Sequence, residues 1–393
     1  MDKLILAINP GSTSYKYSFG LPDQNLLQLH YESLTDGSYV CTTRTPSGQT
    51  EQSIDAEIFS NSLKDCLDRA KQAEIPLDNL VVGLRLVAPG SYFAQNKLID
   101  SEFELQLKQK TDMAPLHITA ARHMITDLRQ ILPDTPIYAV SDSAIHANLP
   151  AVARSYAINA QDAANQDIFR FGYHGISVGS ALRKLQAITT TAPEKVIVCH
   201  LGGGSSVTAI RNNQSIDTSM GFSPLEGLPM TTRSGTIDIG AALYLAKRKY
   251  LTDEQLLEYL NKQSGLLGIS GTSDDIRTLI DQAAAGQQSA QAALDYFVYH
   301  IKHYIGAYVG LLNGLDTLVF TGTVGYRSAV IRNMVCNQLD YLGISLDEQK
   351  NNSLSSDGYI NTHGKLGVAV IKTDEQSEII LKVHELLSRM GAN

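Results

Sequence analysis

Two turns rich in glycine and hydroxyl residues carry the side chains and backbone that could bind phosphate. The first, residues 9–16, follows an apolar run and reads Asn-Pro-Gly-Ser-Thr-Ser-Tyr-Lys. The second, residues 200–206, reads His-Leu-Gly-Gly-Gly-Ser-Ser and also lies between two strand-like stretches. Tight turns of this kind expose backbone N–H groups that can hold an anion, and Lys16 adds a cation. Because the arrangement occurs twice, the sequence predicts two related halves that close on one polyphosphate.

An ordinary β-hairpin is the alternative interpretation of each turn, since glycine-rich hairpins are common. Neither turn is a Walker loop, because no Gly-Lys-Ser/Thr ends the run. The dinucleotide-binding fingerprint also fits poorly, because a strand rather than a helix is expected to follow each turn. The occurrence of two such turns favours phosphate binding over two unrelated hairpins.

Length and composition limit the classes of protein. A chain of 393 residues is expected to form two domains. The net charge is −8 with acids and bases interspersed, which argues against a nucleic-acid or membrane partner and requires any phosphate site to be locally positive. The four cysteines lie far apart without metal-ligand spacing, as expected for reduced thiols in a cytosolic protein. The N-terminal apolar run is too short for a signal peptide, and no apolar run reaches transmembrane length.

Hydrophobic periodicity predicts a mixture of strands and helices. The long segment 217–238 is irregular, and its apolar and hydroxyl residues favour an ordered site loop. A domain boundary is expected near residue 150. The regular elements we expect are strands at 80–87, 137–140, 318–320 (followed by a turn at 321–326) and 367–371, and helices at 117–132, 294–312, 329–342 and, after a capping box at 373–376, the C-terminal segment.

The chain resembles the acetate kinases through a series of runs that keep their order along nearly its whole length. The segment 217–235 is the longest and most specific of them, and the others are 9–14, 114–117, 171–175, 199–202, 264–271, 320–322 and 373–375. The resemblance implies an α/β fold of two ribonuclease-H-like domains with an interdomain cleft, as in the superfamily of sugar kinases, heat-shock ATPases and actin. It also implies an acyl- and phosphate-side domain, 1–148 plus 377–393, and a nucleotide-binding and dimerisation domain, 149–376.

The resemblance further implies a reversible reaction of ATP with acetate, or another short carboxylate, that gives ADP and an acyl phosphate. The metal is expected to be Mg²⁺, which Mn²⁺ can replace, and the enzyme is expected to be a cytoplasmic homodimer. Its domains would close on ligand about hinges near 146–152 and 373–377. Because the acceptor is itself an anion, such a site needs alignment and positive charge more than a strong base.

By resemblance, the catalytic residues are Arg85, Asp142, His174 and Arg233. The two arginines would hold the carboxylate and the transferring phosphoryl group, since guanidinium binds oxyanions with two parallel hydrogen bonds. The residues alone leave other roles open. Arg85 could form a structural ion pair, Asp142 could cap a helix, and His174 could be an ordinary structural histidine.

The remaining assignments also come from the resemblance. Asn9 and Glu375 are the metal-ligand candidates, although Glu375 could merely favour a helix dipole. The acyl-pocket candidates are Arg85, Val87, Leu116, Tyr173 and Pro224, with His117 as a weaker one. Asp275 and Arg277 could instead be solvated charges, and residues two apart would not pair on a helix. The nucleotide-binding candidates are Ser12, Ser14, Lys16, His200, Gly202, Gly203, Gly204, Asp275, Arg277, Gly322, Thr323 and Gly325.

Several positions depart from the family pattern. The segment 84–90 lacks two familiar histidines, Gly203 stands in place of an asparagine, and Tyr173 stands in place of a phenylalanine. Thr323 adds a Cβ where glycine is familiar, within the altered run 323–327. These changes lie mostly among the residues expected to bind the phosphoryl donor, and they predict that the donor could be another nucleoside triphosphate or pyrophosphate. A propionate or butyrate kinase and an inactive nucleotide-binding relative are the competing hypotheses, whereas nothing beyond the phosphate turns favours a sugar kinase.

Overall fold

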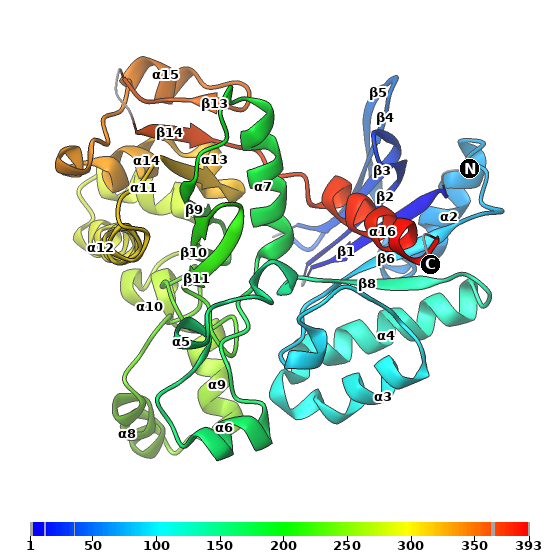
Figure 1. Ribbon diagram of the computed structural model, residues 1–393, viewed down its shortest axis with the longest axis horizontal. Helices are drawn as coiled ribbons and strands as arrows, with labels where there is room; N and C mark the ends of the chain where they lie inside the picture. Colours follow the sequence, from blue (N-terminus) through cyan, green and yellow to red (C-terminus); the bar gives the residue numbers. More distant parts are fainter. Residues whose placement is uncertain (1–2, 12, 35, 363–365, 392–393) are drawn as a thin grey trace. The chain divides into compact units, whose positions relative to one another are not determined.

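The computed structural model describes residues 3–11, 13–34, 36–362 and 366–391 (Figure 1). The chain forms two compact units, each with its own sheet and apolar core. Unit 1 comprises Met1–Ala144 and Asp374–Asn393, and unit 2 comprises Ile145–Thr373. The predicted domain limits, after residue 148 and before residue 377, lie a few residues from these divisions, and the roles assigned to the two parts stay predictions.

Unit 1 contains an eight-stranded sheet in the order β5-β4-β3-β2-β1-β6-β8-β7. Strands β1 to β5 form successive antiparallel pairs, whereas β6 runs parallel to β1 and β8 parallel to β6. The central strands β1, β6 and β8 are almost continuously apolar and buried, as expected for parallel strands covered on both faces. The strands are β1 (Ile5–Pro10), β2 (Ser14–Leu21), β3 (Gln24–Ser33), β4 (Tyr39–Thr45), β5 (Gly48–Ile54), β6 (Val81–Leu86), β7 (Lys97–Leu98) and β8 (Ile137–Ser141).

The C-terminal helix α16 (Glu375–Gly391, red in Figure 1) packs across β1, β2 and β6 of this sheet. Its approach is close at Gly83 in β6, where a Cβ would lie 2.7 Å from Val383 Cγ2 and 2.8 Å from Ile379 Cγ2. Glycine at this position therefore fixes where α16 lies on unit 1. The other helices of the unit are α1 (Ala56–Ser60), α2 (Ser62–Gln72), α3 (Ser101–Gln109) and α4 (Pro115–Ile131).

Unit 2 repeats this topology in a six-stranded sheet with the order β11-β10-β9-β12-β14-β13. Three successive strands pair antiparallel, and β12 and β14 then continue the sheet parallel to β9, as β6 and β8 do beside β1. This repetition confirms the predicted α/β fold of two ribonuclease-H-like units. The strands are β9 (Lys195–Leu201), β10 (Ser205–Arg211), β11 (Gln214–Thr218), β12 (Thr317–Thr321), β13 (Gly358–Tyr359) and β14 (Gly367–Val370).

The longest helix of unit 2 is α12, Gln288–Leu312, whose predicted apolar stripe is buried in the core beside the sheet. Helix α7, Gly175–Ala187, contributes apolar residues to a second core cluster of the unit. The remaining helices are α5 (Ala151–Arg154), α6 (Ala160–Gln166), α8 (Ile239–Lys249), α9 (Asp253–Lys262), α10 (Gly265–Ser270), α11 (Ile276–Ala284), α13 (Gly322–Arg327), α14 (Ala329–Cys336) and α15 (Glu348–Ser353).

Three local predictions about secondary structure were wrong. The expected turn at 321–326 is the helix α13, which begins at Gly322 because that residue adopts a left-handed φ of +77° directly after β12. The helix expected at 329–342 ends at Cys336, and Gln338 just beyond it also has a positive φ. The last helix is capped by Asp374 rather than by Thr373, since Asp374 Oδ1 accepts a hydrogen bond of 3.0 Å from the Ser377 N–H.

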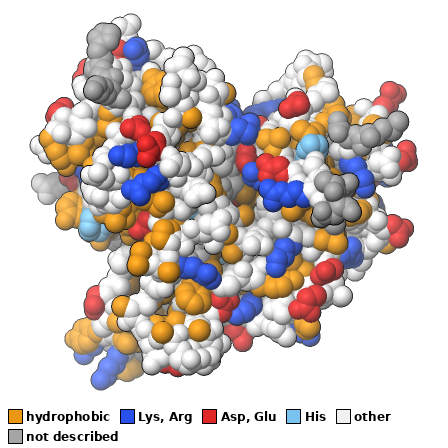
Figure 2. All heavy atoms as spheres, in the orientation of Figure 1, with side chains coloured by type: hydrophobic (Ala, Val, Ile, Leu, Met, Phe, Trp, Pro, Cys, Tyr) orange, Lys and Arg blue, Asp and Glu red, His pale blue; other side chains and the backbone are white. Residues whose placement is uncertain are grey.

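The molecular surface in view mixes charges of both signs. Figure 2 shows Lys and Arg side chains interspersed with Asp and Glu side chains, without a large block of one sign on that face. The pattern agrees with the interspersed charges of the sequence and its net charge of −8. Within the described ranges, the structure contains no helix of the length and apolarity needed to cross a membrane.

Candidate functional site

Four polar side chains of unit 1 converge at one edge of its sheet. Asn9 lies near the end of β1, Arg85 lies in β6, Asp142 directly follows β8, and Glu375 begins α16. Arg85 donates from Nη1 to Asn9 Oδ1 at 3.0 Å and from Nη2 to Asp142 Oδ2 at 2.9 Å. The carboxyl ends of parallel strands meet at the same sheet edge, which brings together residues far apart in sequence.

Glu375 completes this cluster. Its Oε2 accepts from Asn9 Nδ2 at 2.6 Å and lies 3.9 Å from Arg85 Nη1. One guanidinium thus faces two carboxylates, and Asp142 is only 1% exposed. Burial alone would lower the pKa of Arg85, but the charges of Asp142 and Glu375 outweigh burial and raise that pKa. Arg85 is therefore a permanent cation at this edge of the sheet.

Arg85 retains an unused hydrogen-bond donor. Its Nε is buried and has no hydrogen-bond partner among the residues that the structure describes. Unsatisfied buried donors are rare in folded proteins, and at a polar cluster they point to a ligand or ion as the missing partner. The structural ion pair considered from the sequence is present, but it does not account for this donor.

The first glycine turn is a β-hairpin between β1 and β2. Gly11 N–H donates to Ser14 O at 2.7 Å, and Lys16 lies opposite Asn9 in the strand register. Burial, followed by the charge of Lys16, lowers the pKa of His30 on the neighbouring strand. Ser12, a predicted phosphate ligand, lies outside the described residues. The hairpin geometry is thus confirmed, and phosphate binding at this turn stays a prediction.

The metal assignment rests on oxygen atoms alone. Within residues 3–11, 13–34, 36–362 and 366–391, no group of three or more His, Cys, Asp and Glu side chains could hold a metal ion. Asn9 and Glu375 nevertheless fit Mg²⁺, which commonly takes one or two protein oxygens and completes its shell with phosphate oxygens and water. Their contact at 2.6 Å shows that both side chains reach one point.

The second glycine turn, in unit 2, lies against two histidine side chains. A Cβ at Gly204 would lie 3.1 Å from His174 Nε2, a tight contact that shows how closely the ring approaches the backbone at this glycine. The rings of His174 and His200 are 4.2 Å apart between centroids. Hydroxyl groups fix both rings, because Ser206 Oγ lies 3.0 Å from His174 Nδ1 and Ser177 Oγ lies 2.6 Å from His200 Nδ1.

His174 has an unusual backbone conformation. It adopts a left-handed φ of +60° at the position that precedes α7. Such a conformation costs a non-glycine residue on the order of 1–3 kcal/mol, and strained residues of this kind concentrate at functional sites. The strain places the imidazole beside the glycine turn, which favours a binding role over a purely structural one.

Arg233 lies beside the same turn. Its Nη1 is 3.7 Å from a Cβ built at Gly204 and donates to Pro224 O at 3.5 Å and to Met230 Sδ at 3.7 Å. Among the described residues it takes part in no ion pair, and burial lowers its pKa. A partly buried guanidinium without a carboxylate partner is costly unless it binds an anion.

The start of α13 adjoins this turn. A Cβ at Gly202 would lie 3.8 Å from the Thr323 backbone nitrogen, and one at Gly322 would lie 2.4 Å from Leu201 O. The structure therefore brings together His174, the turn 202–204, Arg233 and the α13 residues that the sequence analysis assigned to the nucleotide. Thr323 is exposed there.

Asp275 and Arg277 form an ion pair, contrary to the expectation from their spacing. Asp275 is the N-cap of α11 and accepts from the Arg277 backbone N–H at 2.7 Å, and its Oδ2 lies 2.5 Å from Arg277 Nη2. The spacing rule for helices failed because Asp275 precedes the helix. Arg277 is 85% exposed in its side chain, as the surface-charge alternative requires.

The acyl-pocket candidates belong to both units. Val87 follows β6 in unit 1, and Leu116 lies in α4 with its side chain outside the described part. Tyr173 and Pro224 belong to unit 2. Tyr173 is 1% exposed, and its hydroxyl donates to Phe222 O at 2.7 Å. The hydroxyl that distinguishes this position from the familiar phenylalanine is thus bound to the backbone of the long loop.

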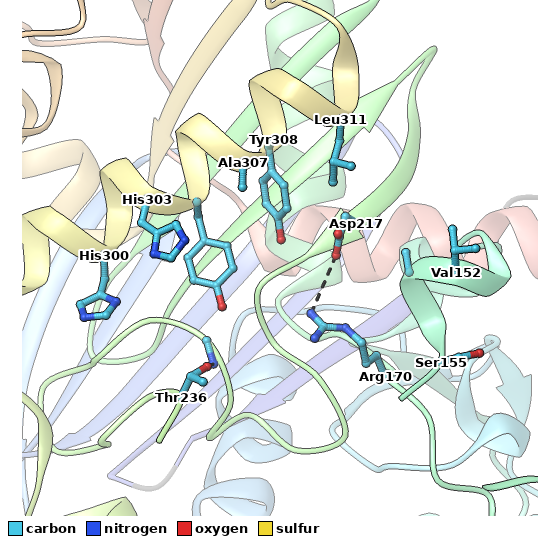
Figure 3. A pocket seen from close by; sticks show the side chains of 13 residues that line it. Val152, Ser155, Arg170, Asp217, Thr236, His300, His303, Ala307, Tyr308 and Leu311 are labelled. Atoms are coloured by element: carbon cyan, nitrogen blue, oxygen red, sulfur yellow. Dashed lines mark hydrogen bonds and ion pairs between the residues drawn. The ribbon is translucent and has the colours of Figure 1, made fainter. Parts of the chain in front are cut away.

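A separate pocket of about 450 Å³ in unit 2 contains none of the predicted site residues (Figure 3). One wall is formed by α12, with His300, His303 and Tyr308, and an ion pair of 3.8 Å between Arg170 and Asp217 lies opposite. We place the candidate site at the glycine turns, because the unpaired arginine and the histidine pair lie there.

A buried network that the sequence does not predict supports the loop 217–235. Tyr156 and Arg170 both bond to Glu226 within that loop, and Arg170 Nη2 also donates to Thr218 O at 2.5 Å. The charge of Glu226, in a loop that also contains Asp217 and Arg233, was the available signal. Its partners could not be identified, because they lie about sixty residues earlier in the chain.

Comparisons with known proteins show which family this chain resembles along its length. The sequence model of the acetokinase family matches residues 4–381. The chain is 36% identical to an acetate kinase of Heliobacterium modesticaldum, over 98% of the chain and 99% of that protein, and 36% identical to an acetate kinase of Methanosarcina acetivorans, over 97% and 96%. A propionate kinase structure from Francisella tularensis superposes with a TM-score of 0.88 at 33% identity, covering 97% of this chain and 98% of that one. An acetate kinase structure from Porphyromonas gingivalis superposes with a TM-score of 0.85 at 29% identity, covering 98% and 100%.

Proposed function

Because the chain belongs to the acetokinase family, we propose that it transfers the γ-phosphoryl group of ATP to acetate, reversibly, with Mg²⁺ as cofactor. The products are acetyl phosphate and ADP, and the enzyme is a phosphotransferase with a carboxyl group as acceptor. The observation that carries the proposal is the convergence of Arg85, Asp142, Glu375 and Asn9 at one sheet edge.

In unit 1, Arg85 binds the acceptor carboxylate and the transferring phosphoryl group. Two anions must approach each other in this reaction, and a fixed guanidinium lowers their repulsion. Asp142 holds Arg85 through the 2.9 Å ion pair and lies beside the acceptor. Asn9 and Glu375 hold the metal ion, which when bound offsets phosphate charge and helps to align the phosphate oxygens.

In unit 2, the backbone of the turn 202–204 and the side chain of His200 bind the phosphates of the nucleotide. His174 donates a hydrogen bond to the transferring group, and Arg233 supplies the second guanidinium. Support comes from the absence of an acid beside Arg233 in the described chain and from the 3.1 Å approach of His174 to Gly204. Gly322, Thr323, Gly325, Asp275 and Arg277 bind the adenosine, while Ser12, Ser14 and Lys16 of unit 1 form the other phosphate turn.

We propose Val87, Leu116, Tyr173 and Pro224 as the residues that contact the acyl group, with Arg85 as the charged residue among them. An apolar pocket of this kind separates acids that differ by one methylene by only about 1–3 kcal/mol. Propionate kinase activity is therefore the second candidate function, and the superposition on a propionate kinase at a TM-score of 0.88 favours testing it.

The test is acyl hydroxamate formation with acetate, propionate and butyrate, each with ATP, GTP and pyrophosphate, in the presence and absence of Mg²⁺. We expect the highest kcat/KM with acetate and ATP and no turnover without a divalent ion. A higher kcat/KM with propionate would support the second candidate. If no combination of donor and acid gives product, the protein is an inactive nucleotide-binding relative and the proposal is refuted.

We also propose a cytoplasmic homodimer. Large apolar side chains are exposed on the helices α8, α9 and α12 of unit 2, which favours burial against a second copy. The four cysteines are free and buried, as in proteins of reducing compartments. Light scattering coupled to gel filtration tests the dimer, and a mass of 42.8 kDa, that of one chain, would exclude it. The most exposed of these side chains are Ile239, Leu243, Tyr244, Leu257 and Tyr299.

A further inference from the structure

We propose that Tyr156 and Tyr173 clamp the backbone of Phe222 and thereby fix the wall of the acyl pocket. The inference rests on the proposed function, because it concerns the pocket in which that reaction takes its acid. Tyr156 Oη accepts from the Phe222 N–H at 2.8 Å, and Tyr173 Oη donates to Phe222 O at 2.7 Å. Both polar backbone groups of one loop residue are therefore held by tyrosine hydroxyls from other segments.

The Tyr156 hydroxyl is itself held in place. It donates to Glu226 Oε2, while Arg170 Nη1 donates to the other carboxylate oxygen of Glu226. Burial, followed by the hydrogen bond with Glu226, raises the pKa of Tyr156, so the hydroxyl stays protonated. The network also needs Gly221, since a Cβ there would lie 1.7 Å from Glu226 Oε2. The clamp is thus a packed and charge-supported part of the loop.

Tyr173 binds the loop from the segment that carries His174. The N–H groups of Phe171 and Gly172 both donate to Gly221 O, at 3.1 and 3.3 Å, next to the bond from Tyr173 to Phe222. The left-handed φ of +68° at Gly172 accompanies this attachment. The strained His174 segment and the loop 217–235 therefore form one bonded assembly.

The position of Phe222 determines the position of the acyl wall. Pro224 follows two residues later, and its carbonyl accepts from Arg233 Nη1 at 3.5 Å. A displaced Phe222 backbone would move Pro224, and with it the contact to Arg233. Where the family pattern leads us to expect a phenylalanine, the hydroxyl of Tyr173 supplies one of the two clamps. We assign Tyr156 as a positioning residue and the hydroxyl of the pocket residue Tyr173 as a second support of the loop, and together they restrict the length of the acid.

The experiment compares Tyr156→Phe and Tyr173→Phe with Tyr359→Phe as the matched control. Tyr359 lies in β13, at the edge of the unit 2 sheet opposite β11, from which the loop 217–235 departs. Hydrogen–deuterium exchange is measured for peptides that contain residue 222, and kcat/KM is measured for acetate and propionate. A general loss of stability would lower both catalytic values together and leave their ratio unchanged.

We expect faster exchange around residue 222 in both loop variants and wild-type exchange in the control. Since one methylene is worth about 10–200-fold in an apolar pocket, the acetate-to-propionate ratio should fall by roughly three- to tenfold in Tyr173→Phe and Tyr156→Phe. Wild-type exchange in both variants, or an unchanged ratio in both, would overturn the clamp. A wild-type protein inactive with every acid would refute the proposed function, whereas the exchange data would still decide on the hydrogen bonds to Phe222.

Discussion

Replacing Arg85 separates a structural from a catalytic role of the unit 1 cluster. The guanidinium uses Nη1 for Asn9 and Nη2 for Asp142, at 3.0 and 2.9 Å. A methionine at residue 85 keeps much of the volume but removes the ion pair to Asp142, which has 2% of its side chain exposed. The companion substitution Asp142→Asn removes the buried negative charge of that pair. The single and double variants together form a double-mutant cycle.

The magnitudes follow from burial. Breaking a buried ion pair on one side costs about 3–5 kcal/mol, so Arg85→Met should lower the free energy of unfolding of unit 1 by roughly that amount. Adding Asp142→Asn should recover most of the loss, because the amide needs no cation. Loss of a positioned charge at the transition state costs about 2.7–4 kcal/mol, or 10²–10³ in kcat. We therefore expect the double variant to regain stability without regaining activity.

The assays are chemical denaturation for stability and hydroxamate formation for kcat. Arg69→Met is the matched control, because Arg69 forms a 2.6 Å pair with Asp65 on α2 of the same unit. The control should lose stability while kcat stays near the wild-type value. If the Arg85→Met/Asp142→Asn protein regains both stability and a kcat within tenfold of wild type, Arg85 is structural and the proposed chemistry at this edge is refuted.

Two further predictions concern unit 2. Gly204→Ala places a Cβ 3.1 Å from His174 Nε2 and should reduce kcat/KM for ATP by about tenfold, since overpacking costs about 1–3 kcal/mol. The control Gly203→Ala, whose Cβ meets no atom within 4 Å, should reduce kcat/KM less. Equal losses of kcat/KM in the two variants would contradict the contact. Burial raises the pKa of Asp217 despite the opposing charge of Arg170. The contribution of Asp217 to folding stability is therefore present below its pKa in the unfolded chain, about 3.9, and is lost as the pH rises through its pKa in the folded protein. Asp217→Asn should therefore raise Tm at pH 7 but not at pH 3.5 in differential scanning fluorimetry, and equal shifts at both pH values would rule out this explanation.

The sequence predicted the parts of the fold that depend on local patterns. Continuous apolar runs identified the central strands, and a helical period identified α4, α12 and α16. The helix α13 was mistaken for a turn because its glycines dominate a six-residue segment. Its conformation depends on Gly322 packing against Leu201 O, where a Cβ would be only 2.4 Å away. Such a long-range contact leaves no periodic signal in the sequence.

The candidate site could be predicted where the family pattern preserves whole motifs. That pattern identified Arg85, Asp142 and Glu375, which the structure brings together at one sheet edge. It did not identify the support of the long loop, since the partners Tyr156 and Glu226 are 70 positions apart. The role of the Tyr173 hydroxyl was equally hidden, because an additional oxygen in a buried tyrosine can find its acceptor only in the folded chain.

The two units show how one topology carries two kinds of chemistry. The strand registers of the two units make Arg85 and Thr321 equivalent. Arg85 follows Leu84, which pairs with Ile8 of the first strand in unit 1, and Thr321 follows Phe320, which pairs with Cys199 of the first strand in unit 2. Unit 1 thus has a cation at the position where unit 2 has a small, buried hydroxyl. The same reasoning makes Asn9 equivalent to His200. Each lies near the end of the strand before a glycine turn and pairs with a residue of the strand after that turn.

The charges that surround these equivalent positions point to different ligands. In unit 1 two carboxylates face one guanidinium, so the cluster has an excess of negative charge and fits a divalent cation together with an anionic substrate. In unit 2 the described residues give Arg233 no acid, and backbone N–H groups and imidazoles surround the turn. An anion with several charges lowers the cost of that unpaired cation. Under the proposed function, we therefore expect the metal ion to bind at the unit 1 cluster and the unpaired guanidinium of unit 2 to bind phosphate.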